Sequence, residues 1–401
     1  MLKKSPTLLL CAAALAFATP ATAQTTVFNG ATGNVDIPCI AFYRNGEPVL
    51  GEDGSHYLRG VQLHTNNAQQ FDLAAVLPPI TGDECLAAFD SGSGLYTDIV
   101  NVGDTAYEVV LQLGAGNVLT LIAHRNVGPA KTSLWVVSNG VNTVYLGGTV
   151  HVLRPYDHPL PRAYDEAYAK ASVLYFEIDM DNPSETGANL TQSAALQLLR
   201  DPQGKRLNQV LSPATYSRLS NYLAGKSIPV ANVETFSAQM IVNAFITDDF
   251  KNQAGATANG VDLTFANKAK ADRKPIYGLE TFQSQMTMIQ ALDEGREDHL
   301  ITESLNALQD GSAPADLASI IQAWRLGDIS TIQASMEELR SESARDYALV
   351  LTNRNNAWLP QIEALLQSPE TELVLVGAAH VAGPEGLVTL LKNRGYSVRK
   401  Y

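Results

Sequence analysis

Hydrophobic and polar residues follow three different patterns along the 401-residue chain. An apolar run fills residues 8–18, short alternating runs follow in residues 24–130, and runs at helical spacing alternate with short apolar runs from residue 131 onward. Alternation every second residue is typical of strands, and recurrence every three or four residues is typical of helices. The patterns therefore predict a leader segment, a β region and a mixed region of helices and strands.

The leader has the features of a secretory signal peptide. Lys3 and Lys4 precede the apolar run, and Ala21-Thr22-Ala23 has the small residues of a cleavage site. The run is shorter than the roughly 20 apolar residues that a membrane-spanning helix needs. Cleavage is expected after Ala23, which predicts a periplasmic or secreted protein with no membrane span in its mature form.

Residues 24–130 are predicted to form a small all-β N-terminal module. Strand-length runs such as 35–42, 107–113 and 118–123 are separated by Gly, Asn and Asp, which favour turns. This segment has two cysteines, Cys39 and Cys85. In an exported protein such a pair favours a structural disulfide over metal ligands, so a Cys39–Cys85 bridge is expected.

Residues 131–401 combine helix and strand signals. Ser212-Pro213 is typical of a helix start, Ser312 opens a second helix ending at Gly327, and 283–308, 329–345 and 349–364 have helical spacing. Six strands are expected between these helices, at 134–137, 143–146, 173–178, 276–279, 373–376 and 397–400. This alternation predicts an α/β (α+β) fold with a mixed or largely parallel β-sheet flanked by helices.

Composition and charge narrow the classes of partner. The chain is 45% hydrophobic and 17% charged, which is typical of a globular protein. Its formal net charge is -13, and residues 24–130 carry three arginines, no lysine and eleven acidic residues. So acidic a protein repels phosphate backbones and anionic lipids, and we expect no nucleic-acid partner.

Two segments, residues 144–151 and 373–380, share one pattern. Each is an apolar strand that ends in Gly-x-x-His, with Gly148 before His151 and Gly377 before His380. A single histidine there is more often a buried residue that caps a strand end, and the bare motif is weak. The matched contexts favour a shared site, because ligands of open α/β sheets bind at the carboxyl ends of the strands.

Two carboxylates occur in similar places. Glu177 interrupts an apolar strand near its end, and Glu280 ends the run that begins at Pro275. A buried carboxylate is costly unless it pairs with a cation, so either a salt bridge or a functional role would explain each. Arg354 lies in a helical pattern, where an arginine by itself is most often solvated.

The domain from about residue 133 to 401 resembles the TraB/GumN family, related to Tiki-type metallopeptidases and more distantly to erythromycin esterase and haem-binding ChaN-like proteins. The residues that carry the resemblance are Gly147-Gly148-Thr149-Val150-His151, His158-Pro159-Leu160-Pro161, Phe176-Glu177-Ile178-Asp179, Gly260-Val261-Asp262, Gly278-Leu279-Glu280-Thr281, Trp324 with Gly327-Asp328, Arg354-Asn355 with Trp358, and Val376-Gly377-Ala378-Ala379-His380-Val381-Ala382-Gly383.

The resemblance implies a divalent-metal hydrolase, expected to be a peptidase, whose metal is Zn, Mn, Co or Fe. Imidazoles and carboxylates suit these metals and leave positions for water. By the same resemblance, His151 and His380 are expected metal ligands and Glu177 a ligand or general base. Arg354 would stabilise an oxyanion, and Glu280 would be a further ligand or orient a histidine. The expected substrate is a peptide or protein.

Other functions stay open from the sequence. A histidine activated by a carboxylate could deprotonate water without a metal, as in an esterase-like hydrolase. The domain could instead be a non-catalytic periplasmic protein that binds a peptide, haem or iron. It has no C-x-x-C-H motif for covalent haem attachment.

Overall fold

The structure is a computed structural model. It describes residues 132–153, 160–182, 197–253, 256–292, 294–310 and 312–401, and, in the N-terminal region, the β-strands between residues 27 and 129 with Gly114. The predicted signal peptide lies outside the described residues, so export stays a prediction. Cys85 lies outside them too, and the Cys39–Cys85 disulfide stays a prediction as well.

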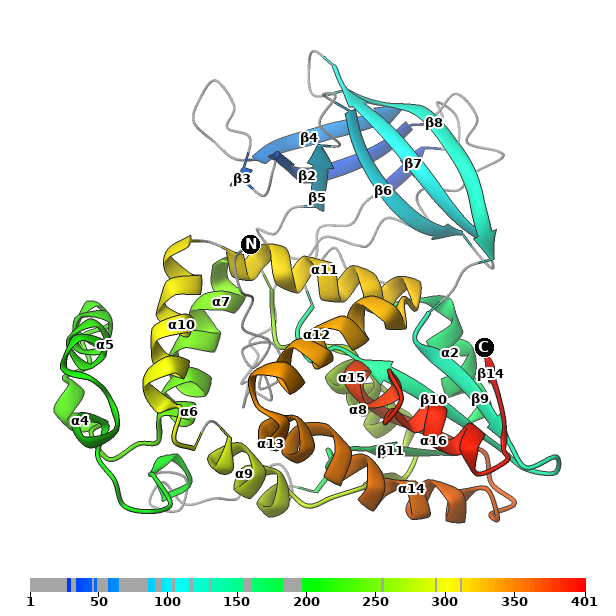
Figure 1. The fold of residues 1–401 in the computed structure, drawn as a ribbon. Helices are drawn as coiled ribbons and strands as arrows, with labels where there is room; N and C mark the ends of the chain where they lie inside the picture. The colour runs from blue at the N-terminus through cyan, green and yellow to red at the C-terminus, as the bar shows by residue number, and fades with distance from the viewer. Residues whose placement is uncertain are drawn as a thin grey trace.

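The N-terminal strands form one sheet that closes on itself (Figure 1). Strand β2 pairs with β4, the order continues β8-β7-β6-β5, and β5 returns to pair with β2. The strands are β1 (Val27–Asn29), β2 (Asn34–Arg44), β3 (Glu47–Pro48), β4 (Tyr57–His64), β5 (Leu86–Asp90), β6 (Leu95–Val102), β7 (Thr105–Leu113) and β8 (Val118–Pro129). The division of the chain into domains at residues 23 and 130 stays a prediction.

The second sheet is mixed and has six strands in the order β12-β11-β13-β10-β9-β14. Its strands are β9 (Leu134–Ser138), β10 (Thr143–Thr149), β11 (Val173–Phe176), β12 (Ile276–Gly278), β13 (Glu372–Gly377) and β14 (Ser397–Lys400). Strands β12, β11, β13 and β10 run parallel, and β9 and β14 are antiparallel to their neighbours. The prediction of a mixed sheet flanked by helices is confirmed.

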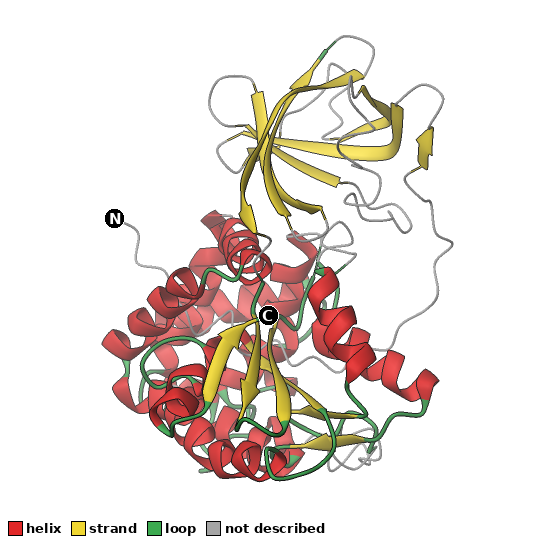
Figure 2. Cartoon of the chain, turned by 90° about the vertical axis from the view of Figure 1, so that its right-hand side faces the viewer, coloured by secondary structure: helices red, strands yellow, loops and turns green. Residues whose placement is uncertain are grey.

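Helices surround this sheet (Figure 2). The α-helices are α2 (Arg162–Lys170), α4 (Leu207–Val210), α5 (Pro213–Gly225), α6 (Ala238–Ile241), α7 (Thr247–Gln253), α8 (Val261–Asp272), α9 (Phe282–Ala291), α10 (Glu297–Asp310), α11 (Ser312–Leu326), α12 (Ile329–Glu342), α13 (Ala344–Tyr347), α14 (Asn353–Leu365), α15 (Ala378–Val381) and α16 (Leu387–Asn393). A 3₁₀ turn, η4 (Val230–Asn232), and two π-helical turns, η5 (Val242–Ile246) and η6 (Ala348–Thr352), complete the set. No helix in the described part of the chain has both the length and the hydropathy of a membrane span.

Helices pack on both faces of the sheet and bury them. Alternate side chains of each strand point to opposite sides, so each strand contributes to two cores. In β13, Leu373 and Leu375 belong to one core with side chains of α2, α8, α11 and α12. Val374 and Val376 belong to the other core, with side chains of α14 and α16. The two cores fix the strand ends relative to helices on both sides.

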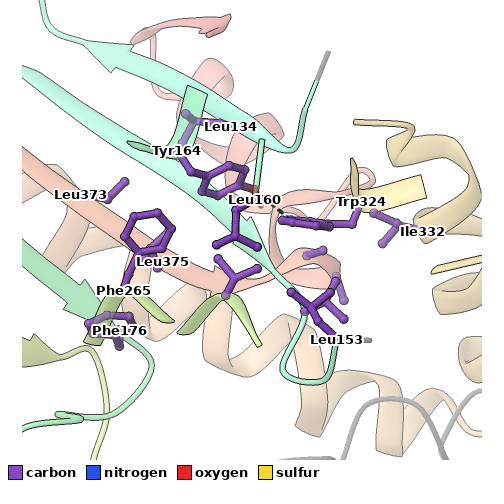
Figure 3. Packing of buried hydrophobic residues seen from close by; sticks show 14 of the residues in the cluster. Leu134, Leu153, Leu160, Tyr164, Phe176, Phe265, Trp324, Ile332, Leu373 and Leu375 are labelled. Carbon is purple, nitrogen blue, oxygen red and sulfur yellow. Dashed lines mark hydrogen bonds between the residues drawn. The ribbon is translucent and has the colours of Figure 1, made fainter. Parts of the chain in front are cut away.

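A hydrogen-bonded pair of aromatic side chains holds the end of β10 (Figure 3). The Tyr164 hydroxyl and the Trp324 Nε1 atom both donate to the carbonyl oxygen of Gly148, the latter at 2.7 Å, and Trp324 also bonds Tyr164 at 2.9 Å. Both side chains are fully buried. They place Gly148 and the residues after it in a fixed position.

Helix signals in the sequence marked the ends of α5 and α11 correctly. Ser212 caps α5 by accepting a hydrogen bond from the Thr215 amide, and Gly327, with φ of 63°, ends α11. The long helical pattern over 283–308 is interrupted in the structure, where α9 ends at Ala291 and α10 begins at Glu297. Gly295 adopts φ of 80° between them, a conformation that helices do not use.

Replacement of Asp328 by alanine is expected to lower the free energy of unfolding by about 1 kcal/mol. The Asp328 carboxylate caps α12 by accepting from the Ser330 and Thr331 amides at 3.1 and 3.3 Å. Hydrogen bonds from Ser330 and Thr331 lower the pKa of Asp328, so its stabilisation is present above about pH 4 and is lost as the pH falls further. Urea denaturation at pH 7 and pH 3 measures this, and Asp328→Asn, which keeps an acceptor, is the control.

Candidate active site

The predicted site residues lie at one edge of the second sheet, at the carboxyl ends of its parallel strands. His151 follows β10 by two residues, Glu177 directly follows β11, and Glu280 follows β12 by two residues. His380 lies in α15, the short helix that begins where β13 ends. The backbone joins two of these ends, because the Glu280 amide donates to the Glu177 carbonyl at 2.8 Å.

Arg354 brings three of these residues together. Its Nη2 atom donates to Glu177 Oε2 and, at 2.6 Å, to Glu280 Oε1, while Nε donates to Glu280 Oε2 at 3.2 Å. Its Nη1 atom donates to His380 Nε2 at 2.9 Å and to the Val350 carbonyl at 3.3 Å. A guanidinium has five N–H groups, so every one of them has an acceptor.

Glu177 is buried and accepts three hydrogen bonds. Its Oε1 atom accepts from the Gly377 amide at 2.8 Å, and its Oε2 atom accepts from Arg354 and from Gln285 Nε2 at 3.2 Å. Burial opposes ionisation, but the charge of Arg354 and the Gly377 amide hold the pKa of Glu177 well below its usual range. The Glu177 carboxylate is therefore ionised at neutral pH.

Glu280 responds differently to the same arginine. Burial raises the pKa of Glu280 above its ordinary value, although Arg354 and Gln285 both bond its carboxylate. The Arg354 guanidinium thus faces two carboxylates with unlike affinities for a proton.

His151 is oriented from behind by a carboxylate. Its Nδ1 atom lies 2.8 Å from Asp262 Oδ2, and Thr149 Oγ1 donates to the other carboxylate oxygen at 2.8 Å. Because Asp262 accepts at Nδ1, the Nε2 atom faces the site. Burial disfavours a charged imidazole, but the Asp262 carboxylate outweighs it and raises the pKa of His151 to about 9.

His380 is held on all sides. Its Nδ1 atom lies 2.7 Å from Asn355 Oδ1, its Nε2 atom accepts from Arg354, and its ring packs on Trp358 with centroids 4.5 Å apart. Burial and the positive charge of Arg354 lower the pKa of His380 to about 3. Its side chain is 3% exposed against 28% for His151, so the two histidines have unlike access to solvent.

Gly377 leaves space between these groups. A Cβ atom on Gly377 would lie 3.2 Å from Glu177 Oε1, 3.6 Å from His380 Cδ2 and 3.8 Å from His151 Nε2. The missing side chain therefore opens a small cradle onto which the carboxylate and His151 Nε2 face. At Gly148 a Cβ would lie 3.1 Å from the Ala378 Cα, so that glycine allows the two Gly-x-x-His segments to approach.

The structure brings all five predicted side chains, His151, Glu177, Glu280, Arg354 and His380, to this edge. Their catalytic and ligand roles stay predictions. The sequence pattern gave no role to Asp262 and Asn355, although both belong to motifs that carry the family resemblance. It also did not predict that Thr149 bonds Asp262 or that Gln285 bonds Glu177 and Glu280. No local signal marks Gln285, which lies inside an ordinary helical pattern.

The comparison with known families follows the same part of the chain. The sequence profile of the TraB/PrgY/gumN family matches residues 133–400. The chain belongs to the TraB/PrgY/gumN family. The matched region contains the whole second sheet and every residue of the candidate site.

Curated relatives of this TraB/PrgY/gumN chain carry the name metalloprotease. It is 23% identical to Metalloprotease TIKI1 of Danio rerio over 320 residues, 66% of this chain and 62% of that protein. It is also 23% identical to Metalloprotease TIKI1 of Homo sapiens over 318 residues, 66% of this chain and 61% of that protein. The matched region thus spans less than two thirds of these relatives. No solved structure was found to match the chain.

The relatives' name implies a metal ion. Whether these residues suit one depends on the atoms that face the cradle at Gly377. Within the described residues, no three or more His, Cys, Asp or Glu side chains are spaced as a metal site. A cation can be held by fewer protein ligands when water completes its shell. His151 Nε2 and Glu177 Oε1 both face the cradle, and the carboxylates of Glu177, Glu280 and Asp262 outnumber the single guanidinium. In the described part of the chain, His151 Nε2 and Glu177 Oε1 are thus the two atoms that could hold a divalent cation, with water at its other positions.

Proposed function

We propose that this protein is an exported, divalent-metal-dependent hydrolase that cleaves peptide bonds. The observation that carries the proposal is the cradle at Gly377, which His151 Nε2 and Glu177 Oε1 face at the carboxyl ends of β10 and β11. The name metalloprotease of the TIKI relatives supports the reaction class. The leader pattern at residues 1–23 supports export.

In this proposal His151 and Glu177 hold the cation, which could be Zn, Mn, Co or Fe. When bound, it supplies a Lewis acid that polarises a carbonyl and makes water a better nucleophile at neutral pH. Asp262 accepts from His151 Nδ1 and so directs Nε2 towards the cradle, and Thr149 fixes Asp262. Such carboxylate–histidine pairs are the usual support of metal-bound imidazoles.

Arg354 places a positive charge beside the reacting groups. That charge stabilises an oxyanion developing on the scissile carbonyl. A substrate oxygen that bonds Nη1 would replace the contact to the Val350 carbonyl, which is the longest of the five at 3.3 Å. Gln285 bonds both Glu177 and Glu280, and Glu280 bonds the Arg354 guanidinium. These contacts hold the guanidinium and the Glu177 carboxylate in place beside the cradle.

Metal-dependent cleavage of a peptide library is expected, and its loss tests the function. The mature chain is stripped with a chelator, assayed on the library, and assayed again after addition of Mn²⁺, Co²⁺ or Zn²⁺. The wild type should regain cleavage, and His151→Gln should retain less than about one hundredth of the rate. His299, an exposed histidine of α10, provides the matched control His299→Gln. Equal cleavage by stripped and reloaded enzyme would refute a metal mechanism.

The His151–Asp262 pair also supports a second candidate, in which the imidazole itself deprotonates water without a metal. Because Asp262 raises the pKa of His151 to about 9, this mechanism would act at alkaline pH, where the imidazole is unprotonated. The same library assay separates the two mechanisms. Cleavage that survives metal removal but is lost in both His151→Gln and Asp262→Asn would favour the metal-free mechanism. Elemental analysis of protein purified without a histidine tag gives an independent answer.

A further inference from the structure

The two Gly-x-x-His histidines look equivalent in sequence but have different hydrogen-bond partners. His151 is bonded at Nδ1, and within the described residues no protein atom bonds its Nε2. His380 is bonded at both nitrogens, to Asn355 and to Arg354. An imidazole can bind a metal ion or accept a proton only through a nitrogen whose lone pair is available.

The contacts of Asn355 assign the proton of His380. The Asn355 Nδ2 atom donates to two carbonyl oxygens, of His380 at 3.2 Å and of Glu385 at 2.8 Å. Carbonyl oxygens only accept, so the amide oxygen is the atom that faces His380 Nδ1, and that nitrogen must donate. The Nε2 lone pair of His380 therefore points at Arg354 Nη1 and accepts its hydrogen.

One helix supplies three sides of the His380 environment. Arg354 and Asn355 are consecutive residues, yet both reach the ring, and Trp358 packs against it one turn later. The π-helical turn η6 ends directly before α14 and shifts the helical register at this point. The Trp358 ring also lies 4.6 Å from the guanidinium carbon, so imidazole, guanidinium and indole form one packed group.

We propose that the two histidines do different work: His151 is the reacting histidine, and His380 is a positioning residue that holds Arg354 against Glu177 and Glu280. This assignment rests on the proposed function in one respect, because it names the imidazole that takes the metal. For His380 to bind a cation instead, Arg354 Nη1 would lose its short contact in a buried environment and a second positive charge would stand beside the guanidinium.

The same substitution at both histidines tests the assignment through metal binding. Isothermal titration of metal-stripped mature protein with Mn²⁺ or Co²⁺ alone compares wild type, His151→Gln and His380→Gln. A glutamine oxygen at the position of His380 Nε2 can still accept from Arg354, so His380→Gln should bind within about threefold of wild type, and His151→Gln at least about tenfold more weakly. A tenfold or greater loss in His380→Gln would overturn the assignment.

A double-mutant cycle tests the His380–Arg354 contact without any metal. Urea unfolding of stripped wild type, His380→Leu, Arg354→Met and the double variant should show coupling of at least about tenfold in the unfolding equilibrium constant, or 1.4 kcal/mol. Additive effects would overturn the assignment. Should wild type bind no metal, the proposed function fails on that ground and the cycle alone decides the role of His380.

Rescue separates positioning from mere packing. In the active enzyme His380→Gln should keep at least about tenfold more kcat than His380→Leu, because only glutamine retains an acceptor for Arg354. Equal kcat values for the two variants would contradict a positioning role. If His380→Leu does not fold, the titrations of the glutamine variants decide.

Discussion

Replacement of Gly260 by alanine is expected to lower the free energy of unfolding by about 3 kcal/mol or more and to abolish activity. A Cβ atom at this position would lie 2.3 Å from the carbonyl carbon and oxygen of His151 and 2.4 Å from the Val150 oxygen. These are backbone atoms and cannot move aside as a flexible side chain would. The Val261 amide also bonds the Val150 carbonyl at 3.0 Å, so the start of α8 and the segment after β10 cannot separate without breaking that bond. The expected destabilisation comes from this steric overlap and not from backbone strain, because φ of Gly260 is an ordinary -77°.

The same collision explains the expected loss of activity. Gly260 precedes α8, whose second residue, Asp262, bonds His151. Moving α8 away from β10 would separate that pair. The control is Gly225→Ala, where a Cβ meets nothing within 4 Å and the change should alter stability by less than about 1 kcal/mol. Urea denaturation and the peptide assay measure both variants, and a Gly260→Ala protein as stable and active as the control would show that α8 can move freely.

The second sheet was predictable because each of its strands is marked by a local run of apolar residues. Six apolar runs marked the strands of the second sheet, and all six occur within a few residues of the predicted ends. Glu177 and Glu280 stood out because a carboxylate at the end of an apolar run is costly, and the structure supplies the cation, Arg354, that each required. Topology then placed the strand ends, and the residues behind them, at one edge.

The partners of those residues could not be predicted in the same way. Asp262 is 111 residues from His151, and Gln285 is 108 residues from Glu177. Such contacts depend on how α8 and α9 pack on the sheet, and no local pattern encodes that. The local pattern around Arg354 was equally uninformative, since a helical arginine is usually solvated and the π-helical turn before it leaves no mark in the hydrophobic spacing, and only the family resemblance singled this residue out.

Arg354→Met is expected to cost metal-free protein about 3–5 kcal/mol of unfolding free energy at pH 7. The Arg354 side chain is 10% exposed, and its removal leaves Glu177 and Glu280, at 9% and 12%, without their cation. Methionine keeps much of the packing on Trp358 and removes the charge. Arg162, whose side chain is 73% exposed and pairs with Glu166, gives the control Arg162→Met, expected to change stability by less than about 1 kcal/mol.

The pH dependence of this deficit identifies its cause. In the wild type the pKa of Glu177 is lowered, so its stabilisation is present above the unfolded value of about 4.3 and is lost as the pH falls through the folded value. Without Arg354, the Gly377 amide and Gln285 still bond the carboxylates, but the positive charge that opposed burial is gone, and burial is expected to raise the pKa of both carboxylates above their unfolded values. The folded variant then takes up protons more readily than its unfolded chain, so the deficit should shrink between pH 7 and pH 5 in urea denaturation. A deficit that stays constant over that range would mean that lost packing, and not two unpaired carboxylates, destabilises the variant.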